Sequence, residues 1–519
     1  MAKAKTKQKT MEESLWESAN KLRGTVESSE YKHIVLGLIF LKFVSDTYEA
    51  RREQLIADGK EAFVDMVEFY TMENVFYLPE ISRWSYIKQH AKQDDIALKI
   101  DTALSTVEKN NPSLKGALPD NYFSRLGLDA SKLSSLIDTI NNINTIQDKG
   151  SDIVGRVYEY FLSKFAIAEG KGKGEFYTPK SIVNLIANMI EPYKGKIYDP
   201  ACGSGGMFVQ SVKFIDAHNG SKKDISVYGQ EYTATTYKLA KMNLAIRGIS
   251  ANLGSVAADT FSKDQHKDLK ADFIMANPPF NQKDWRGVNE LVDDPRWSGY
   301  ETPPTSNANY GWILNMVSKL SQNGVAGFIL ANGALSGGGE EYKIRKKLIE
   351  NDMVEAILIL PQNMFYTTNI SVTIWILNAN KKERTFEQNG RTKVHRDRTD
   401  EILFMDLRQK GVPFEKKFME FDEEAIDEIS STYHTWQSDK EAYRDVAEYS
   451  YSASKDEVEK KDFSLVPSKY IEFVNRDENI DFDEKMKTLQ SEFKVLLEEE
   501  EKSKKELLKV FEELGYAID

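Results

Sequence analysis

The stretch "YDPACGSGG", Tyr198 to Gly206, joins a short apolar run to the helical segment "MFVQSVKF". It predicts a strand, a tight turn and a helix in direct succession. Gly203, Gly205 and Gly206 would let the backbone approach a ligand closely at the carboxyl end of a parallel strand, where open α/β sheets bind cofactors. The stretch lacks the GxGxxG fingerprint, and the chain has no GxxxxGK(S/T) phosphate loop. Taken alone, the turn is weak evidence for a nucleoside site.

Around this stretch, short apolar runs alternate with helical segments. The runs are "KIYDPA", "ISVYGQE", "DFIMANPP", "VAGFILANGAL", "MVEAILIL", "SVTIWILN" and "EILFMDL". Strands that alternate with helices indicate a mostly parallel sheet with helices on both faces. A short connection joins "AILILP" to "SVTIWIL", which favours an antiparallel hairpin at the edge of that sheet.

The segments that flank the sheet are predicted to be helical. From Met11 to about Ile146, apolar residues recur at helical spacing, as at Ile34, Leu38 and Leu41. Near the other end, a 4-3 spacing indicates a helix with an apolar stripe, formed by Leu489, Phe493, Leu496, Leu507, Val510 and Leu514. The helix would either fold back on its own chain or dock on a second protein, and the periodicity alone leaves both open.

Composition limits the function classes. The chain has 519 residues and a formal net charge of −12. Such an acidic chain is poorly suited to hold DNA or RNA over a long surface by itself, because phosphate neutralisation needs clustered Lys and Arg. If the substrate is a nucleic acid, a partner protein should supply much of the binding surface for it.

Cysteine, histidine and hydropathy exclude further classes. The single cysteine, Cys202, excludes an internal disulfide framework, and the six histidines show no spacing typical of metal ligands, so no metal site is expected. The apolar run from Ile34 to Leu41 is far shorter than the roughly 20 residues of a membrane helix, and "MAKAKTKQKT" has no apolar signal core. We expect a cytoplasmic protein without membrane association.

Two acidic residues follow predicted strands. Glu231 ends the run "ISVYGQE", where a carboxylate can accept hydrogen bonds from both hydroxyls of a ribose. Asp259 in "AADTF" is expected at the end of a further short segment, where it would be a suitable acceptor for an adenine amino group. Each acid by itself is better explained as a solvated loop carboxylate.

The stretch "ANPPFNQKD", Ala276 to Asp284, ends the apolar run "ADFIMA" with an amide, two prolines and a phenylalanine. Adjacent prolines remove two backbone donors and fix two φ angles. The Asn277 amide and the neighbouring carbonyls are therefore held rigidly with free acceptor capacity. We expect a group with N–H donors to dock there.

The glycine turn, Glu231, Asp259 and "NPPF" occur in this order, each at an expected strand end. With these motifs the chain resembles S-adenosylmethionine-dependent amino-methyltransferases that carry an (N/D/S)-P-P-(Y/F/W) motif. More closely, it resembles the modification subunit of type I restriction-modification systems, which methylates N6 of adenine in double-stranded DNA. The resemblance extends over nearly the whole chain, including "FYLPEISRWSYI", "DIVGRVYEYFLSKFA", "GEFYTPK" and "DFSLVPSKYIEF".

The resemblance implies three domains in an α/β protein. These are an N-terminal helical domain, residues 1–150, a Rossmann-like S-adenosylmethionine-dependent methyltransferase domain, 151–415, and a C-terminal helical region with a docking helix, 416–519. It also implies that S-adenosylmethionine is bound by Glu175, Phe176, Tyr177, Thr178, Pro179, Lys180, Ser204, Gly205, Gly206 and Glu231, with Asp199, Gly203 and Asp259 as companions. Cys202 inside the turn is interpreted as a small buried filler, since no nearby residue supplies a base to activate it.

The same resemblance implies a catalytic set of Asn277, Pro278, Pro279 and Phe280. The side-chain oxygen of Asn277 and the carbonyl of Pro278 would accept hydrogen bonds from the N6 amino group of a flipped adenine. Phe280 would stack on the base. The methyl group would move by in-line displacement, without a metal or a covalent intermediate.

The partners implied are a DNA specificity subunit, a second copy of this chain, a restriction subunit with motor and nuclease, and double-stranded DNA. Sequence alone leaves open methylation of a glutamine amide in a protein or of a guanine amino group in RNA. Such relatives usually carry tyrosine at the fourth motif position, where this chain has Phe280. The intact set of site residues disfavours a scaffold, and the chain has no motor motif and no convincing PD…ExK nuclease pairing.

Overall fold

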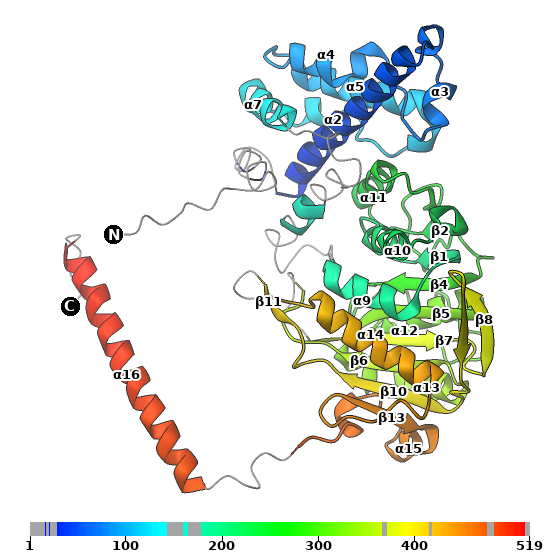
Figure 1. Ribbon diagram of the computed structural model, residues 1–519, viewed down its shortest axis with the longest axis vertical. Coiled ribbons are helices and arrows are strands. Elements are labelled where there is room, and N and C mark those ends of the chain that lie inside the picture. Colours follow the sequence, from blue (N-terminus) through cyan, green and yellow to red (C-terminus); the bar gives the residue numbers. More distant parts are fainter. Residues whose placement is uncertain are drawn as a thin grey trace. The chain divides into compact units, whose positions relative to one another are not determined.

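The computed structural model describes Trp16, Asn20 and residues 28–142, 159–164, 178–365, 371–414, 418–474 and 482–513. The chain divides into two compact units, Met1–Ile471 and Glu472–Asp519. The larger unit contains helices and a central sheet, and the one helix described in the smaller unit spans Phe482–Glu513 (Figure 1). This confirms the α/β fold class, whereas the three-domain division at residues 150 and 415 stays a prediction.

The N-terminal region is helical, as the apolar spacing predicts. Its elements are α2 (Ser28–Ala57), η1 (Glu61–Phe63), α3 (Glu68–Thr71), η2 (Glu80–Ser82), α4 (Trp84–Gln89), α5 (Ile96–Asn110), η3 (Pro112–Leu114), α6 (Tyr122–Arg125) and α7 (Ala130–Asn141). Ile34, Leu38 and Leu41 of α2 are fully buried in its core. The buried Asp101 carboxylate accepts hydrogen bonds from the backbone N–H groups that begin α6, at 2.8 to 2.9 Å. It therefore satisfies donors that a helix start leaves unpaired.

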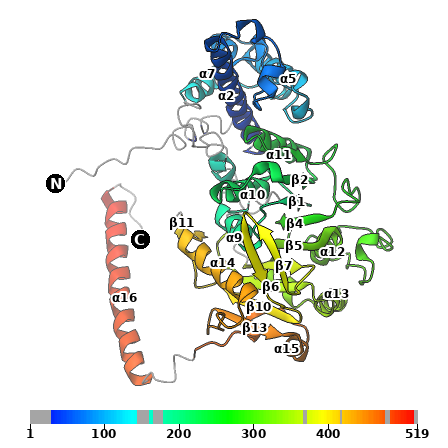
Figure 2. The same cartoon turned by 45° about the vertical axis from the view of Figure 1, so that its right-hand side comes forward.

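The central sheet has nine strands in the order β13-β10-β6-β7-β5-β4-β1-β2-β3 (Figures 1 and 2). They are β1 (Gly195–Asp199), β2 (Ile225–Gly229), β3 (Ala251–Asn252), β4 (Ala271–Ala276), β5 (Leu320–Ala331), β6 (Val354–Ile359), β7 (Val372–Asn378), β10 (Glu401–Asp406) and β13 (Ser450–Ser454). β7 runs antiparallel to β5 and β6, and β13 runs antiparallel to β10, while all other pairs are parallel. The mostly parallel sheet is confirmed.

Helices cover both faces of the sheet, as predicted. α9 (Lys180–Ile190) and α14 (Glu423–Ser438) pack on one face, and α12 (Asn309–Lys319) and α13 (Gly339–Glu350) pack on the other. Along β7, Ile374 and Ile376 enter the first core, whereas Trp375 and Leu377 enter the second. This alternation is the period of two of a strand buried on both sides.

The prediction of an antiparallel hairpin is confirmed, but its predicted position at the sheet edge is wrong. β6 and β7 do pair antiparallel, but β7 lies between β5 and β6, and β6 pairs with β10 on its other side. β10, the expected strand "EILFMDL", then pairs with β13. The reason is that β6 and β7 are almost fully buried, so the backbone N–H and C=O groups along both edges of each strand need partners in neighbouring strands.

The remaining elements lie outside the central sheet. They are α10 (Gly206–Ala217), η4 (Lys222–Asp224), α11 (Ala234–Ile246), η5 (Pro295–Trp297), η6 (Asn332–Leu335), α15 (Lys455–Lys460), η7 (Pro467–Lys469) and the two-stranded sheets β8 (Arg384–Gln388) with β9 (Arg391–His395) and β11 (Val412–Phe414) with β12 (Phe418–Glu420).

In the smaller unit, α16 spans Phe482–Glu513. Its predicted stripe is exposed by 48 to 63% at Leu489, Phe493, Leu496, Leu507 and Val510, and Leu514 lies outside the described residues. Within the described ranges, none of the helices is both long and apolar enough to cross a membrane.

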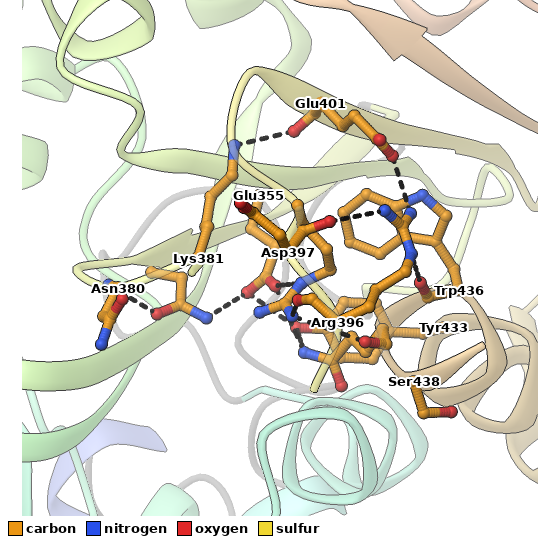
Figure 3. Close-up of polar contacts among 12 residues, drawn as sticks. Glu355, Asn380, Lys381, Arg396, Asp397, Glu401, Tyr433, Trp436 and Ser438 are labelled. Atoms are coloured by element: carbon orange, nitrogen blue, oxygen red, sulfur yellow. Dashed lines mark hydrogen bonds and ion pairs between the residues drawn. The ribbon is translucent and has the colours of Figure 1, made fainter. Parts of the chain in front are cut away.

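A buried polar cluster ties β6 and β7 to α14 (Figure 3). Arg398 Nε donates to Glu355 Oε1 at 2.8 Å, and both side chains are fully buried. Asn378 of β7 and Tyr433 of α14 donate to the other Glu355 oxygen, at 2.7 and 3.1 Å. Burial alone would raise the pKa of Glu355, but the Arg398 guanidinium, the Asn378 amide and the charge of Lys381 lower it to about 2. The cluster therefore holds a charged carboxylate inside the fold.

Candidate active site

The glycine turn follows β1 directly, as the sequence predicts. β1 ends at Asp199 and α10 begins at Gly206. Gly203 and Gly205 have φ angles of 53° and 82°, a conformation that favours glycine. A side chain at Gly205 would also meet Leu244 of α11 at 3.4 Å. The positive φ therefore favours glycine at position 205, while a Cβ there would be in van der Waals contact with Leu244.

Two carboxylates lie at this edge of the sheet. Asp199 is 1% exposed, and its Oδ1 accepts a hydrogen bond from the Ala201 N–H at 3.0 Å. Burial raises the pKa of Asp199 to about 8, with a further contribution from the charge of Glu231. Glu231 follows β2, the neighbour of β1, and its two oxygens accept from Gly203 N–H at 3.1 Å and Thr233 N–H at 2.7 Å. Glu231 therefore contacts the glycine turn itself.

Contrary to the expectation from the sequence, Asp259 does not lie at the end of a strand. The strand before it, β3, ends at Asn252, so "AADTF" is a turn and not the end of a strand. The Asp259 carboxylate accepts from the backbone N–H groups of Phe261 and Ser262, at 3.2 and 3.0 Å. The chain nevertheless brings this turn beside Glu231, since Ala258 N–H donates to the Glu231 carbonyl at 2.9 Å.

The "NPPF" stretch follows β4, which pairs with β1. The Asn277 side chain is 9% exposed, and its Nδ2 donates to Thr178 Oγ1 at 2.9 Å. Asn277 Oδ1 is buried and has no hydrogen-bond partner among the described residues. A buried acceptor without a partner costs about 1 to 3 kcal/mol, so its presence needs an explanation. It is the free acceptor that the sequence predicts, and Pro278 and Pro279 follow it, buried and half-buried.

Phe280 lies next to a second aromatic ring and before a braced turn. Its ring centroid is 5.9 Å from that of the buried Phe365, with the planes 80° apart. The next residue, Asn281, has a φ of 52°. The fully buried Asn309 accepts from Asn281 N–H at 3.0 Å and donates to Asn281 Oδ1 at 2.9 Å. These reciprocal bonds fix the backbone immediately after Phe280.

One small cavity brings four of the predicted cofactor residues together with side chains that sequence reasoning missed. Its lining includes Thr178, Lys180, Ser204 and Gly206 from the prediction, and Glu159, Gln210 and Asn243 beside them. Gln210 is 5% exposed, and its Oε1 has no hydrogen-bond partner in the described part of the chain. No motif indicates Asn243 or Asn309, because only folding brings these helix residues to the site.

The other predicted residues are accounted for as follows. Pro179 is buried and precedes α9. Glu175, Phe176 and Tyr177 lie outside the described residues. Cys202 is 4% exposed in an apolar cluster, and burial raises the pKa of its thiol, which agrees with the filler interpretation. Among the residues that the structure describes, no group of three or more His, Cys, Asp or Glu could hold a metal ion.

Known proteins have similar sequences. Residues 149–479 match the model of the N-6 DNA Methylase family, and residues 11–140 match that of the HsdM N-terminal domain. The HindI methylase subunit of a type I restriction enzyme from Haemophilus influenzae is 40% identical over 462 residues, which cover 85% of this chain and 100% of that protein. The chain belongs to the type I restriction enzyme methylase subunits of the N-6 DNA methylase family.

This methylase also resembles a more distant relative and a solved structure. The type I MjaIX methylase subunit from Methanocaldococcus jannaschii is 34% identical over 527 residues, covering 97% of this chain and 91% of that protein. The crystal structure of a type I methyltransferase subunit from Streptococcus thermophilus superposes with a TM-score of 0.73 at 21% identity, covering 89% of this chain and 99% of that one. The methylase therefore has the fold of that subunit and belongs to the adenine-specific DNA methyltransferases.

Proposed function

We propose that this methylase transfers the methyl group of S-adenosylmethionine to the N6 amino group of adenine in double-stranded DNA. The observation that carries the proposal is the buried Asn277 Oδ1, which has no hydrogen-bond partner among the described residues. It follows β4, while the glycine turn follows the adjacent strand β1. An amide acceptor one strand away from a nucleoside-type turn suits a reaction between a nucleoside cofactor and an amino group.

The residues present fit S-adenosylmethionine. Glu231 accepts backbone N–H groups from Gly203 and Thr233, and we propose that this carboxylate, placed beside the turn, binds the ribose hydroxyls. The turn from Gly203 to Gly206 gives the cofactor close access to the backbone, and Gln210 Oε1 is a buried acceptor beside it. Asp199 and Asp259 are proposed as companions, and Glu175 to Lys180 as the covering loop. When bound, the cofactor supplies an activated methyl group.

The target adenine would be flipped out of the duplex to reach this edge of the sheet. Asn277 Oδ1 and the Pro278 carbonyl would accept its two N6 hydrogens, which directs the nitrogen lone pair toward the methyl group. Phe280 would stack on the base, worth about 1 to 3 kcal/mol. The hydrogen bond from Asn277 Nδ2 to Thr178 holds the amide in the required orientation. Positioning and electrostatics would supply the rate.

Sequence specificity is assigned to partners. A net charge of −12 gives the chain little means of holding a duplex by itself. We assign DNA reading to a specificity subunit, with a second copy of this chain and a restriction subunit in the complex. The exposed stripe of α16 is the proposed docking surface, within a C-terminal region of residues 416–519 that follows a helical domain, 1–150, and a catalytic domain, 151–415.

The experiment is product analysis of the complex formed with its specificity subunit. The complex is incubated with methyl-labelled S-adenosylmethionine and duplex DNA, and the DNA is digested to nucleosides. The proposal predicts label in N6-methyladenine. Absence of label from adenine would overturn the proposal, and label in a protein glutamine or in guanine when protein or RNA replaces the DNA would support the alternative that the sequence left open.

A further inference from the structure

α11 belongs to two hydrophobic cores. Leu239, Met242 and Ile246 on one side pack in the core of the N-terminal helical region. Tyr237, Ala240 and Leu244 on the other side pack with Cys202 and Phe208 beside the glycine turn. One rigid helix therefore touches both the N-terminal region and the proposed cofactor site.

Two lysines of α11 strengthen its attachment to the N-terminal region. Lys238 Nζ donates to the Leu118 carbonyl at 3.1 Å, and Lys241 Nζ donates to the Lys115 carbonyl at 2.8 Å. Both carbonyls lie between η3 and α6. Each bond is made by the end of a partly exposed side chain, and Lys241 Nζ also lies 4.8 Å from the centroid of the Tyr237 ring.

The opposite side of α11 holds the glycine turn in place. Asn243 is 1% exposed, and its Nδ2 donates to the Ser204 carbonyl at 2.7 Å. Ser204 lies between Gly203 and Gly205, which both have positive φ angles. A turn of this composition has many accessible backbone conformations. The hydrogen bond from Asn243 selects one of them, and Leu244 packs against the next residue, Gly205.

Asn243 is itself held by an ionic chain. Its Oδ1 accepts a short hydrogen bond from Arg247, whose Nη2 lies 3.2 Å from Glu159 Oε1. Lys213 of α10 donates to the same Glu159 oxygen at 2.6 Å. Glu159 lies in the helical residues 159–164, and Phe161 of this segment is buried in the N-terminal core. The orientation of Asn243 therefore depends on Glu159, in a segment that packs on the N-terminal core, as well as on α10.

We propose that Asn243 is a positioning residue for the cofactor turn, and that α11 makes affinity for S-adenosylmethionine depend on its attachment to the N-terminal helical region. This rests on the proposed function, because it assumes that the turn binds this cofactor. Asn243 acts through the Ser204 carbonyl and the backbone of Gly205. It does not touch the reacting atoms.

The test is calorimetric titration of the full chain with S-adenosylmethionine. Asn243→Asp keeps the size of the side chain and an acceptor for Arg247, but it replaces the N–H donated to Ser204 with an oxygen. We expect a dissociation constant at least about tenfold higher, the result of losing one favourable hydrogen bond of about 1.4 kcal/mol. In the assembled complex, KM for the cofactor should rise while kcat at saturating cofactor stays within about twofold of wild type.

The double variant Lys238→Ala/Lys241→Ala tests the coupling separately. We expect cofactor affinity to fall by about threefold or more with the melting temperature nearly unchanged, since the removed bonds are peripheral. Lys222→Ala/Lys223→Ala, which removes the same charge from the exposed η4, is the matched control and should bind as wild type does. A general loss of stability would lower the melting temperature as well, so lower cofactor affinity at an unchanged melting temperature points to the loss of coupling.

The outcomes are distinguishable. If the wild-type chain binds no S-adenosylmethionine, the cofactor assignment of the proposed function fails. If the wild type binds and folded Asn243→Asp binds equally well, only the positioning role is overturned. Should Asn243→Asp not fold, the lysine double variant decides the proposal, and wild-type affinity in that variant overturns it.

Discussion

Asn277 Nδ2 donates a hydrogen bond to Thr178 Oγ1 at 2.9 Å, which leaves Asn277 Oδ1 buried and without a partner among the described residues. The Thr178 hydroxyl, which precedes α9, binds the nitrogen of the amide and leaves its oxygen available as an acceptor. An acceptor held in advance stabilises a transition state more than one that must reorient, because the reorganisation is already complete.

We therefore predict that Asn277→Ala lowers kcat for DNA methylation by about 100- to 1,000-fold, the loss typical for one preorganised polar group. Cofactor affinity should stay within about twofold of wild type, because Asn277 serves the target base. Single-turnover kinetics and calorimetry would measure the two quantities. Thr178→Ser, which keeps the hydroxyl, is the control, and full activity of Asn277→Ala would refute the assignment.

Glu231→Ala should weaken S-adenosylmethionine binding by about 10- to 100-fold, since hydrogen bonds to a charged group contribute about 1.5 to 3 kcal/mol. The variant also loses the bonds from Gly203 and Thr233 to this carboxylate. Glu231→Gln keeps one side-chain oxygen and should have intermediate affinity. Calorimetric titration tests this, and wild-type affinity in a folded Glu231→Ala protein would exclude Glu231 as a ribose ligand.

Asp199 should make the stability of the cofactor-free protein depend on pH. Burial raises its pKa from 3.8 to about 8, so between these values the folded state keeps a proton that the unfolded state releases. The stability contribution is complete below about pH 4 and is lost as the pH rises toward 8. Asp199→Asn cannot titrate, so its stability relative to wild type should increase over this range. Denaturant unfolding at pH 4.5, 6 and 8 checks the sign, and a difference that falls with pH would contradict it.

Features that depend on neighbouring residues could be predicted from the sequence, whereas contacts between residues far apart in the chain could not. The glycine turn, "NPPF" and the strands before them are local patterns and are found where the sequence indicates them, whereas the strand end expected at Asp259 is a turn. The hairpin of β6 and β7 was expected at the sheet edge, since the pattern that predicts the strand β10 does not show which strand it pairs with, and β13 was not predicted. Asn243 and Asn309 went unpredicted because their partners, Ser204 and Asn281, lie 39 and 28 residues away.

The Glu355 and Arg398 pair should be essential for folding of the sheet region. Both side chains are fully buried, so removing one leaves an uncompensated charge. Arg398→Met is expected to lower the free energy of unfolding by about 3 to 5 kcal/mol. The double variant Glu355→Leu/Arg398→Met should recover much of this loss, because neither charge remains. Chemical denaturation measures both, and equal stability of Arg398→Met and wild type would refute the prediction.

Removal of α16 should block assembly without affecting cofactor binding. A chain truncated after Asp481 lacks the exposed stripe but keeps the glycine turn and Glu231. We expect wild-type affinity for S-adenosylmethionine and loss of co-purification with the specificity subunit. As a gentler variant, Leu489→Lys/Phe493→Lys should have the same effect. Undiminished complex formation by the truncated chain would move the docking surface elsewhere.

The central claim is that this chain methylates adenine N6 through Asn277. Its most direct test is to express the chain with its specificity subunit in a host that lacks adenine methylation, and then to map N6-methyladenine in the genomic DNA by single-molecule sequencing. The account predicts nearly complete modification of adenines within one defined sequence for the wild type and none for Asn277→Ala at equal protein levels. Unmodified adenine in the wild-type host, or undiminished modification by Asn277→Ala, would contradict it.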